Sequence, residues 1–524
     1  MTIQIYDSLT REKQPFQPIE PGQLGLYLCG PTVYSDCHVG HLMGPIVFDT
    51  IARWMKARGH DVRFVINITD IDDKIIKRAI EENVAWNVIA ERYTEQYFDY
   101  LRELSITTVT DHPKCTEHVD GMIAFIEHLM SEDKAYVAAD GVYYDVRKQV
   151  GYGKLSGRKL DDMQSGARIA AVEGLRDPAD FALWKLAKEG EPSWPSPWGG
   201  GRPGWHIECS VMSSAILGTE FDIHGGGDDL KFPHHENEIA QSEAHGHGYA
   251  NLWMHHGLVQ YGGKKVAKSD PRMADPKFAR QFQARWLIDN YGAPTMRLFL
   301  TRTNYRRPID FEPQNIEGAR TGLARYHRQL GDLLDEPGEP GLDEILAREL
   351  PDELAAARAR FCEAMDDDFG TSEAVGELFS LAAWARDHEA ERETALRLSR
   401  DLGRLLGLFL PGDAERMERK GSAEEAITLV LEALIALRAE ARERKDFQTA
   451  DGIRDLATSA GVELRDAGDG SSFELSTAAT DDLLDALVTG SLALRTAARD
   501  RKDYATSDAI RDHLTAAGIK IQDH

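Results

Sequence analysis

An apolar run, a turn, an amphipathic segment and a second apolar run follow one another near the N-terminus, and this order constrains the fold most. The runs Leu24–Cys29 and Asp61–Thr69 predict strands. Between them, apolar residues recur with a helical period over Gly40–Arg58, and Gly59 stands where helices commonly end on glycine. This order predicts a parallel pair of strands with a right-handed crossover. Ligands bind beyond the carboxyl ends of such strands, so a crevice is expected there.

Length and composition limit the remaining possibilities. The chain has 524 residues, which at about 150 residues per domain predicts three or four domains. Its formal net charge of −26 argues against non-specific coating of nucleic acid but permits one local basic face. We read no membrane span and no secretory signal, and expect a cytoplasmic protein. The five cysteines favour free thiols or metal ligands over a disulfide framework.

Further segments carry weaker signals. We expect a helix over Ile75–Leu104, β-type runs at Trp205–Ser213 and Phe221–His224, and the start of a helix at Pro233. The stretch Gln281–Gly412 is largely helical in its periodicity.

The C-terminal region contains an internal repeat. Arg444–Phe447 matches Arg501–Tyr504, and Asp451–Asp455 matches Asp508–Asp512 at the same offset. Two copies are fewer than a solenoid needs, which favours duplication of one small helical module. The basic residues of each copy form either a solvated helix face or an edge that contacts RNA phosphates, and both interpretations stay open.

Two histidines open the helix that follows the first strand, in the motif His38-Val-Gly-His41. A helix N-terminus offers free N–H groups and the positive end of the dipole, which suit a polyphosphate. Half a zinc site or a capping pair would explain the same motif equally well.

Two glycine-rich segments are further candidates for nucleotide binding. Gly262–Ser269 carries Lys265 and Lys268, whose charges could follow a phosphate as the transition state forms, or could simply be solvated. Gly225–Gly227 precedes Asp229; glycine lets an adenosine approach the backbone, and a carboxylate can accept ribose hydroxyls. A plain turn explains this second pattern as well.

A third constellation has metal-ligand chemistry. His234 and Glu238 are four residues apart on one predicted helical face, and Cys29 and Cys209 each end a predicted strand. Thiolate, imidazole and carboxylate are ligands that tetrahedral zinc accepts. The spacing is dispersed, so rival ligands remain. The rivals are His206, His224, His235 and Cys37.

Together these motifs resemble those of the cysteinyl-tRNA synthetases, a family of class I aminoacyl-tRNA synthetases. The resemblance extends over most of the chain to about residue 475, and Pro233-His-His-Glu-Asn-Glu238 is its most specific block. The matching segments are Leu28–Tyr34, His38–His41, Asn67–Lys74, Tyr152–Arg158, Gly204–Ser210, His224–Gly227, Phe232–Gln241 and Lys265–Ser269.

The resemblance implies an α/β fold, with a Rossmann-type parallel-sheet catalytic domain split by an insertion, then an α-helical domain and a small C-terminal anticodon-binding module. The implied segments are 1–110 and 205–320 for the catalytic halves, 111–204 for the insertion, 321–420 for the helical bundle, 425–475 for the module and 485–524 for its partial duplicate.

The resemblance also implies ATP-dependent activation of L-cysteine to cysteinyl-adenylate and transfer to the 3′ end of tRNA(Cys) by a monomer with one Zn²⁺ per chain and Mg²⁺ beside ATP. By position, it implies these roles: catalysis by His38, His41, Lys265 and Lys268; ATP binding by His38, His41, Gly226, Asp229 and Lys268; a cysteine pocket of Thr69, Trp205 and His224; zinc ligation by Cys29, Cys209, His234 and Glu238; and RNA contact by Arg444, Lys445 and Phe473.

Zinc would act as the selector of the amino acid. An ordinary pocket separates near-isosteres by only about 1–3 kcal/mol, and serine differs from cysteine by oxygen in place of sulfur. Because zinc prefers a thiolate, a direct zinc–sulfur bond would reject serine without an editing site.

The sequence departs from the family pattern at two places. Val266 and Ala267 replace the usual Met and Ser of the lysine loop, and Phe473 occupies the place of a Trp. Two alternatives stay open: a related enzyme that passes activated cysteine to a small amine, and a non-catalytic tRNA-binding relative, which the altered lysine loop alone supports. The C-terminal module opposes the first, and the retained histidines and Lys268 oppose the second.

Overall fold

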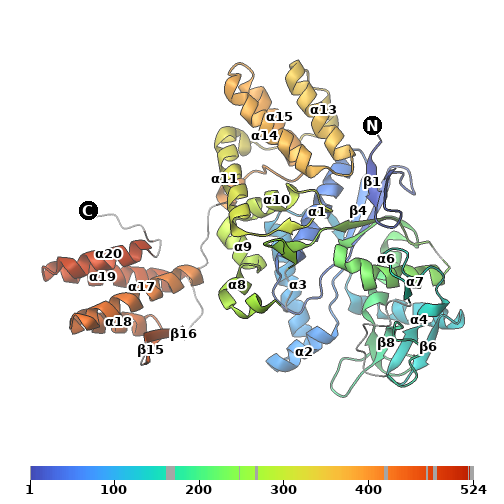
Figure 1. The fold of residues 1–524 in the computed structure, drawn as a ribbon, viewed down its shortest axis with the longest axis horizontal. Helices are drawn as coiled ribbons and strands as arrows, with labels where there is room; N and C mark the ends of the chain where they lie inside the picture. Colours follow the sequence, from blue (N-terminus) through green and yellow to red (C-terminus); the bar gives the residue numbers. More distant parts are fainter. Residues whose placement is uncertain are drawn as a thin grey trace. The chain divides into compact units, whose positions relative to one another are not determined.

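The computed structural model describes residues 2–160, 172–246, 248–265, 270–417, 423–467, 470–475, 481–516 and 519. The chain forms two compact units, Met1–Glu418 and Arg419–His524 (Figure 1). Within the described parts of both units, none of the helices has the length and apolar character needed to cross a membrane.

A five-stranded parallel sheet forms the centre of the first unit, in the order β11-β10-β3-β4-β5. Its strands are β3 (Gln23–Leu28), β4 (Asp61–Ile66), β5 (Val109–Asp111), β10 (Phe221–Gly227) and β11 (Ala250–His256). The predicted strand–helix–strand unit is confirmed, because α1 (Val39–Ala57) connects β3 to β4 and the two strands pair in parallel. The strand order reverses between β3 and β10, so the crevice beyond their carboxyl ends is the topological switch point.

Both faces of this sheet are covered, which explains why its strands are apolar runs. Leu24, Leu26 and Leu28 of β3 belong to the core that contains α1. Tyr27 of β3 and Val65 of β4 point to the other face and belong to the core that contains α6 (Trp205–Leu217). Alternation along each strand therefore divides its side chains between two cores.

The helices near the sheet end at residues with left-handed backbone. Gly59 follows α1 with φ +88°, as its position predicts. The single helix expected over Ile75–Leu104 is instead two, α2 (Asp73–Glu82) and α3 (Trp86–Glu103). They are separated at Asn83, whose φ of 53° ends α2.

Between β5 and α6 the chain forms a separate antiparallel sheet, in the order β6-β7-β8-β9. The elements of this region are α4 (Val119–Ser131), β6 (Ala135–Ala138), β7 (Gly141–Tyr144), β8 (Phe181–Leu186) and β9 (Gly201–Pro203).

The β-type run expected at Trp205–Ser213 is wrong: these residues form the first part of helix α6. Every residue from His206 to Ser213 is buried. A helix buried on all sides has no amphipathic period, so the pattern of apolar residues could not distinguish it from a buried strand. Cys209 therefore lies within a helix. The strand expected at Phe221–His224 is confirmed as part of β10.

Helices complete the first unit after the sheet, as the periodicity of Gln281–Gly412 predicts. They include α9 (Ala284–Tyr291), α10 (Ala293–Thr301), α11 (Pro313–Leu330), α13 (Asp352–Asp366), α14 (Thr371–Asp387) and α15 (Arg392–Arg404), whereas α7 (Glu236–Ala244) lies earlier, between β10 and β11. Short strands accompany them: β1 (Gln4–Asp7), β2 (Glu12–Pro15), β12 (Val259–Tyr261), β13 (Lys264–Lys265) and β14 (Ile309–Asp310).

The second unit contains both copies of the repeat, and each copy folds as a helical hairpin (Figure 1). Its elements are α17 (Ala423–Glu443), α18 (Phe447–Ser459), β15 (Val462–Ala467), β16 (Gly470–Leu475), α19 (Asp481–Asp500) and α20 (Tyr504–Ala516). The hairpins pack on each other, α17 against α20 and α18 against α19.

Candidate active site

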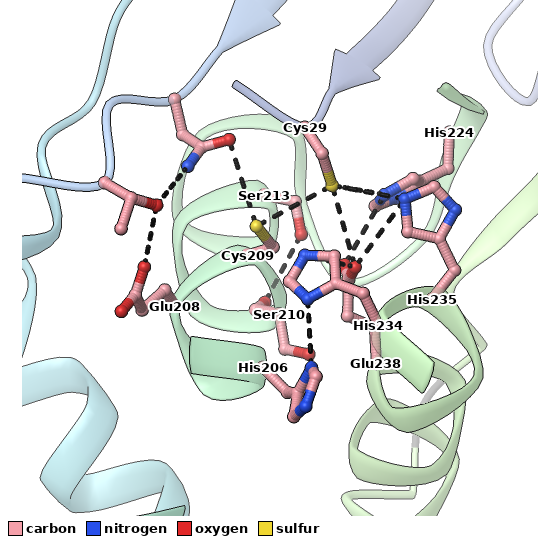
Figure 2. A network of polar contacts seen from close by, with 12 residues as sticks. Cys29, His206, Glu208, Cys209, Ser210, Ser213, His224, His234, His235 and Glu238 are labelled. Atoms are coloured by element: carbon pink, nitrogen blue, oxygen red, sulfur yellow. Dashed lines mark hydrogen bonds and ion pairs between the residues drawn. The ribbon is translucent and has the colours of Figure 1, made fainter. Parts of the chain in front are cut away.

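Four side chains converge beyond the carboxyl ends of β3 and β10 (Figure 2). Cys29 follows β3, Cys209 lies on α6, His234 lies in the π-helical turn Lys231–His235, and Glu238 lies on α7. One ligand atom from each of the four lies within 4.8 Å of all the others. The structure thus brings together the four residues that the sequence proposed as metal ligands.

The separations in this cluster suit a tetrahedral ion. Cys29 Sγ lies 3.8 Å from Cys209 Sγ and 3.7 Å from Glu238 Oε1, and His234 Nε2 lies 3.1 Å from Glu238 Oε1. Zinc–sulfur bonds of about 2.3 Å at tetrahedral angles place two sulfurs about 3.8 Å apart, and bonds of about 2.0–2.1 Å place nitrogen and oxygen about 3.3 Å apart. The donor set and its spacing therefore fit zinc.

A second four-residue group shares two of these side chains. Cys29, His224, His235 and Glu238 also meet the distance criterion for a common ion. Cys29 Sγ lies 3.4 Å from His224 Nε2 and 3.3 Å from His235 Nε2. Of the rivals named from the sequence, His224 and His235 are therefore compatible with a ligand role, and Cys37 belongs to neither group.

In each ligand group, one histidine ligand contacts a further histidine that is not itself in the group. His206 Nδ1 lies 2.9 Å from His234 Nδ1, so this rival ligand supports the first group from outside. His235 Nδ1 lies 2.9 Å from His255 Nε2 and thus has an equivalent neighbour. Such contacts fix the orientation and tautomer of a ligating imidazole.

Burial dominates the electrostatics of the cluster. It raises the pKa of the Cys29 thiol, lowers the pKa of His234 and raises the pKa of Glu238 to about 8. Among the described residues, no lysine or arginine forms an ion pair with Glu238, whose ion-pair partners are histidines. Acidic ligands buried without a cation of the protein are suited to a bound metal ion.

His38 and His41 form the capping pair that was one interpretation of their motif. The Gly40 N–H donates to His38 Nδ1 at 3.1 Å, and the His38 N–H donates to His41 Nδ1 at 3.3 Å. The two rings stack with centroids 3.8 Å apart at the start of α1. Both imidazoles are therefore held at a helix N-terminus beside the crevice.

The glycines at the end of β10 allow the protein itself to pack closely. A Cβ on Gly225 would lie 2.3 Å from the Phe48 ring, and one on Gly226 would lie 2.6 Å from the His235 ring. Asp229 follows on an exposed 3₁₀ turn. Nucleotide contacts by Gly226 and Asp229 stay predictions.

The proposed cysteine pocket adjoins the cluster. The Thr69 hydroxyl is buried and donates to Glu208 at 2.9 Å. Trp205 is 39% exposed, and its ring stacks on His234 with centroids 4.3 Å apart. His224 is fully buried and borders Cys29 and Glu238.

Sequence reasoning missed Glu208, which accepts from Thr69 and whose Oε2 lies 2.8 Å from Cys115 Sγ. Its one signal was its place beside Cys209.

The remaining predicted residues belong to the lysine loop and to the second unit. Lys268 falls outside the described residues, as do Val266 and Ala267. Lys265 belongs to β13, whose backbone pairs with β12. In the second unit Arg444 and Lys445 are exposed, whereas Phe473 on β16 is partly buried against the core.

Comparison with family models and solved structures shows the class of protein to which the chain belongs. The model of the class I (C) tRNA synthetase catalytic domain matches residues 15–321, and that of the DALR domain matches residues 360–410. Methionyl-tRNA synthetase of Mycobacterium tuberculosis, solved with methionyl-adenylate, has the same fold at TM-score 0.52 and 14% identity, over 77% of this chain and 94% of that chain. The fold is that of a class I tRNA synthetase.

Curated relatives then define the family. The Cysteine--tRNA ligase of Chromobacterium violaceum is 46% identical over 472 residues, covering 89% of this chain and 98% of the relative. That of Hahella chejuensis is 44% identical over 479 residues, covering 90% and 99%. The chain belongs to the cysteine–tRNA ligase family.

Proposed function

We propose that this chain activates L-cysteine with ATP and transfers it to the 3′ end of tRNA(Cys). One zinc ion, held by Cys29, Cys209, His234 and Glu238, selects the amino acid, and Mg²⁺ accompanies ATP. The observation that carries the proposal is the convergence of two sulfurs, an imidazole and a carboxylate at the switch point of the sheet. The family membership supports the reaction.

The first ligand group is favoured over the second by its chemistry. It offers two sulfurs, whereas the group with His224 and His235 offers one. Zinc prefers thiolate ligands, and protein thiols buried beside it would be deprotonated on binding. In this assignment His224 and His235 border Cys29 and line the pocket instead of binding the ion.

When bound, zinc supplies a Lewis acid that favours the thiolate of cysteine over the hydroxyl of serine. Around it, Trp205 covers His234 with its half-exposed ring. The Thr69 hydroxyl donates to Glu208 and accepts from Asn67 Nδ2 at 3.4 Å, which fixes this side chain where it would border the substrate.

The capping pair prepares both histidines for phosphate contact. Because Nδ1 of His38 and Nδ1 of His41 each accept a backbone N–H, the neutral ring carries its proton on Nε2. Each Nε2–H can therefore donate to a phosphate oxygen. The cysteine carboxylate attacks the α-phosphorus and pyrophosphate leaves; a ribose hydroxyl of the tRNA then attacks the carbonyl and AMP leaves. We assign Lys268, assisted by Lys265, to the departing phosphates.

The experiment is exchange of labelled pyrophosphate into ATP, followed by tRNA charging on the same sample. We expect exchange with cysteine and not with serine, and a charged 3′ end when tRNA(Cys) is added. Lys268→Ala should slow the exchange with little change in cysteine binding. Exchange without charging would support the enzyme that uses a small amine. Binding of tRNA without exchange would support the non-catalytic relative.

We further propose a monomer that acts in the cytoplasm, with the catalytic, inserted, helical and C-terminal segments divided as the sequence predicts. Light scattering of the purified chain would give the mass of one chain, and a mass of two chains would contradict this part.

A further inference from the structure

Glu238 lies among Cys29, His224 and His234 (Figure 2), and its two carboxylate oxygens face different neighbours. Oε1 lies 3.1 Å from His234 Nε2 and 3.7 Å from Cys29 Sγ, which belong to two side chains of the first ligand group. Oε2 lies 3.4 Å from His224 Nε2 and accepts a hydrogen bond from the Tyr249 hydroxyl at 2.8 Å. One oxygen is therefore turned toward the other candidate ligands, and the second is engaged by the protein.

Tyr249 is held in place by parts of the chain outside the ligand groups. It lies just before β11, is only 6% exposed, and its carbonyl accepts the N–H of Phe221 at 3.1 Å. The two rings meet edge to face with centroids 5.1 Å apart. The Tyr249 hydroxyl also lies 3.0 Å from Ser213 Oγ on α6. These contacts fix the position of the hydroxyl independently of the candidate ligands.

The protons available at this hydroxyl decide which atom donates. A carboxylate that binds a metal ion is ionised and can only accept hydrogen bonds. The single hydroxyl proton of Tyr249 is therefore donated to Glu238 Oε2, and the Tyr249 oxygen accepts from the Ser213 hydroxyl. Both ends of this short chain of hydrogen bonds are buried.

His224 supplies a second donor to the same oxygen. Its Nε2 lies 3.4 Å from Glu238 Oε2 and 3.4 Å from Cys29 Sγ. Its Nδ1 is buried and has no hydrogen-bond partner among the described residues, so a neutral ring with its proton on Nε2 matches these surroundings. A protonated Nε2 cannot bind a metal ion, and His224 is then a donor to Oε2 instead of a ligand.

We propose that Tyr249, assisted by His224, is a positioning residue that restricts Glu238 to metal ligation through Oε1 alone. A carboxylate can bind an ion through one oxygen or through both, and hydrogen bonds to a ligating carboxylate orient it. The inference rests on the proposed function in one respect, that the first ligand group holds the ion.

This restriction keeps a coordination position free for the substrate. Zinc in catalytic sites can expand from four to five ligands. If Glu238 Oε2 also bound the ion, it would occupy the position that the sulfur of cysteine needs. Tyr249 thus favours cysteine binding without contacting cysteine.

The first readout is the number of ligands around Co(II), bound in place of zinc. Co(II) accepts the same types of donor, and its visible absorption is stronger with four ligands than with five. Tyr249→Phe removes only the hydroxyl and leaves the ring. We expect strong absorption in the wild type and weaker absorption in the variant, because Glu238 Oε2 joins the ion. Both proteins should bind one Co(II) per chain when the metal is in excess.

Cysteine-dependent pyrophosphate exchange gives the second readout. In zinc-loaded Tyr249→Phe the KM for cysteine should rise about tenfold, whereas the KM for ATP should stay at the wild-type value. A residue that only stabilised the fold would not separate the two constants. In the Co(II) form, the variant should need a correspondingly higher cysteine concentration to change the absorption.

Two other tyrosines provide matched controls. Tyr305→Phe removes a buried hydroxyl that also donates to a carboxylate at 2.8 Å, that of Asp368, which is in neither ligand group. Tyr144→Phe removes a hydroxyl that donates to the Ala240 carbonyl at 2.9 Å, on the helix α7 that carries Glu238. Both variants should keep the wild-type Co(II) absorption and the wild-type KM for cysteine.

The outcomes separate failure of this inference from failure of the proposed function. Wild-type absorption and KM in Tyr249→Phe, or equal changes in Tyr144→Phe, would overturn the role of Tyr249, whereas one metal ion per chain would still support the proposed function. Absence of metal from the unmodified chain would overturn the metal assignment and this inference with it. Retention of Co(II) by Cys209→Ser together with its loss from His224→Ala would assign the ion to the second ligand group and overturn both.

Discussion

Two deeply buried polar clusters in the first unit contrast in how their charge is balanced. In one, Asp49 of α1 is fully buried beside Arg297 of α10, accepts from Arg53 at 2.8 Å and accepts from the Thr108 hydroxyl at 2.6 Å. Burial alone would raise the pKa of Asp49, but Arg297 and Arg53 lower it to about 2.

In the crevice, the pKa of a buried carboxyl group is shifted upward instead. The pKa of Glu238 is raised to about 8, and its ion-pair partners among the described residues are histidines. The first cluster contains its own cations and is structural. The second gathers sulfur, nitrogen and oxygen donors without one, which is why we assign the metal there.

The largest effect should come from removing the cation of the structural cluster. Arg297→Met leaves Asp49 buried with Arg53 alone and also removes hydrogen bonds to the Leu104 and Leu406 carbonyls. We expect the free energy of unfolding to fall by about 3–5 kcal/mol. Tryptophan fluorescence during urea unfolding measures it for the first unit alone, because all nine tryptophans lie there.

The control is Arg285→Met, which breaks the ion pairs of a partly exposed arginine with Glu103 and Asp289. It should cost at most about 1 kcal/mol. Equal losses in the two variants would show that the Asp49 cluster is not the balanced pair described above.

The next effect is the pH dependence of the same cluster. The pKa of Asp49 is lower in the folded chain than its usual value, so its contribution is complete above about pH 4 and is lost as pH falls toward 2. This contribution is worth about 2–3 kcal/mol. Unfolding between pH 5 and pH 2 should therefore show a steeper loss of stability in the wild type than in Asp49→Asn. Equal slopes of unfolding free energy against pH in the two proteins would contradict this prediction.

Much of the fold follows from local sequence, as β3, α1 and β4 show. Their signals are apolar runs, one amphipathic period and Gly59, each of which acts within a few residues. Helix α6 was missed because burial on every side removes the period that reveals a helix. The boundary between α2 and α3 was missed because Asn83 adopts the left-handed conformation without a glycine to signal it.

The site was only partly predictable for a different reason. The ligand types at Cys29, Cys209, His234 and Glu238 could be named from chemistry and resemblance. The sequence contains no distances, so it could not tell that His235 also reaches Cys29, or that Glu208 would hold Thr69. Those contacts depend on how three distant segments pack.

A smaller effect should separate the two ligand groups. His206→Ala removes the neighbour of His234, and His255→Ala removes the equivalent neighbour of His235. If the group with Cys209 binds zinc, His206→Ala should lower zinc affinity about 10–100-fold, and His255→Ala should change it little. Competition with a zinc chelator measures both affinities. The reverse order would assign the ion to the group with His224 and His235.

The most direct test of the central claim is the zinc content of the purified chain, measured for the wild type, Cys209→Ser and Cys37→Ser. Cys37 is the matched control because it is a buried cysteine that belongs to neither ligand group. The account predicts one zinc per chain in the wild type and in Cys37→Ser, and almost none in Cys209→Ser. Full zinc in Cys209→Ser, or none in the wild type, would contradict it.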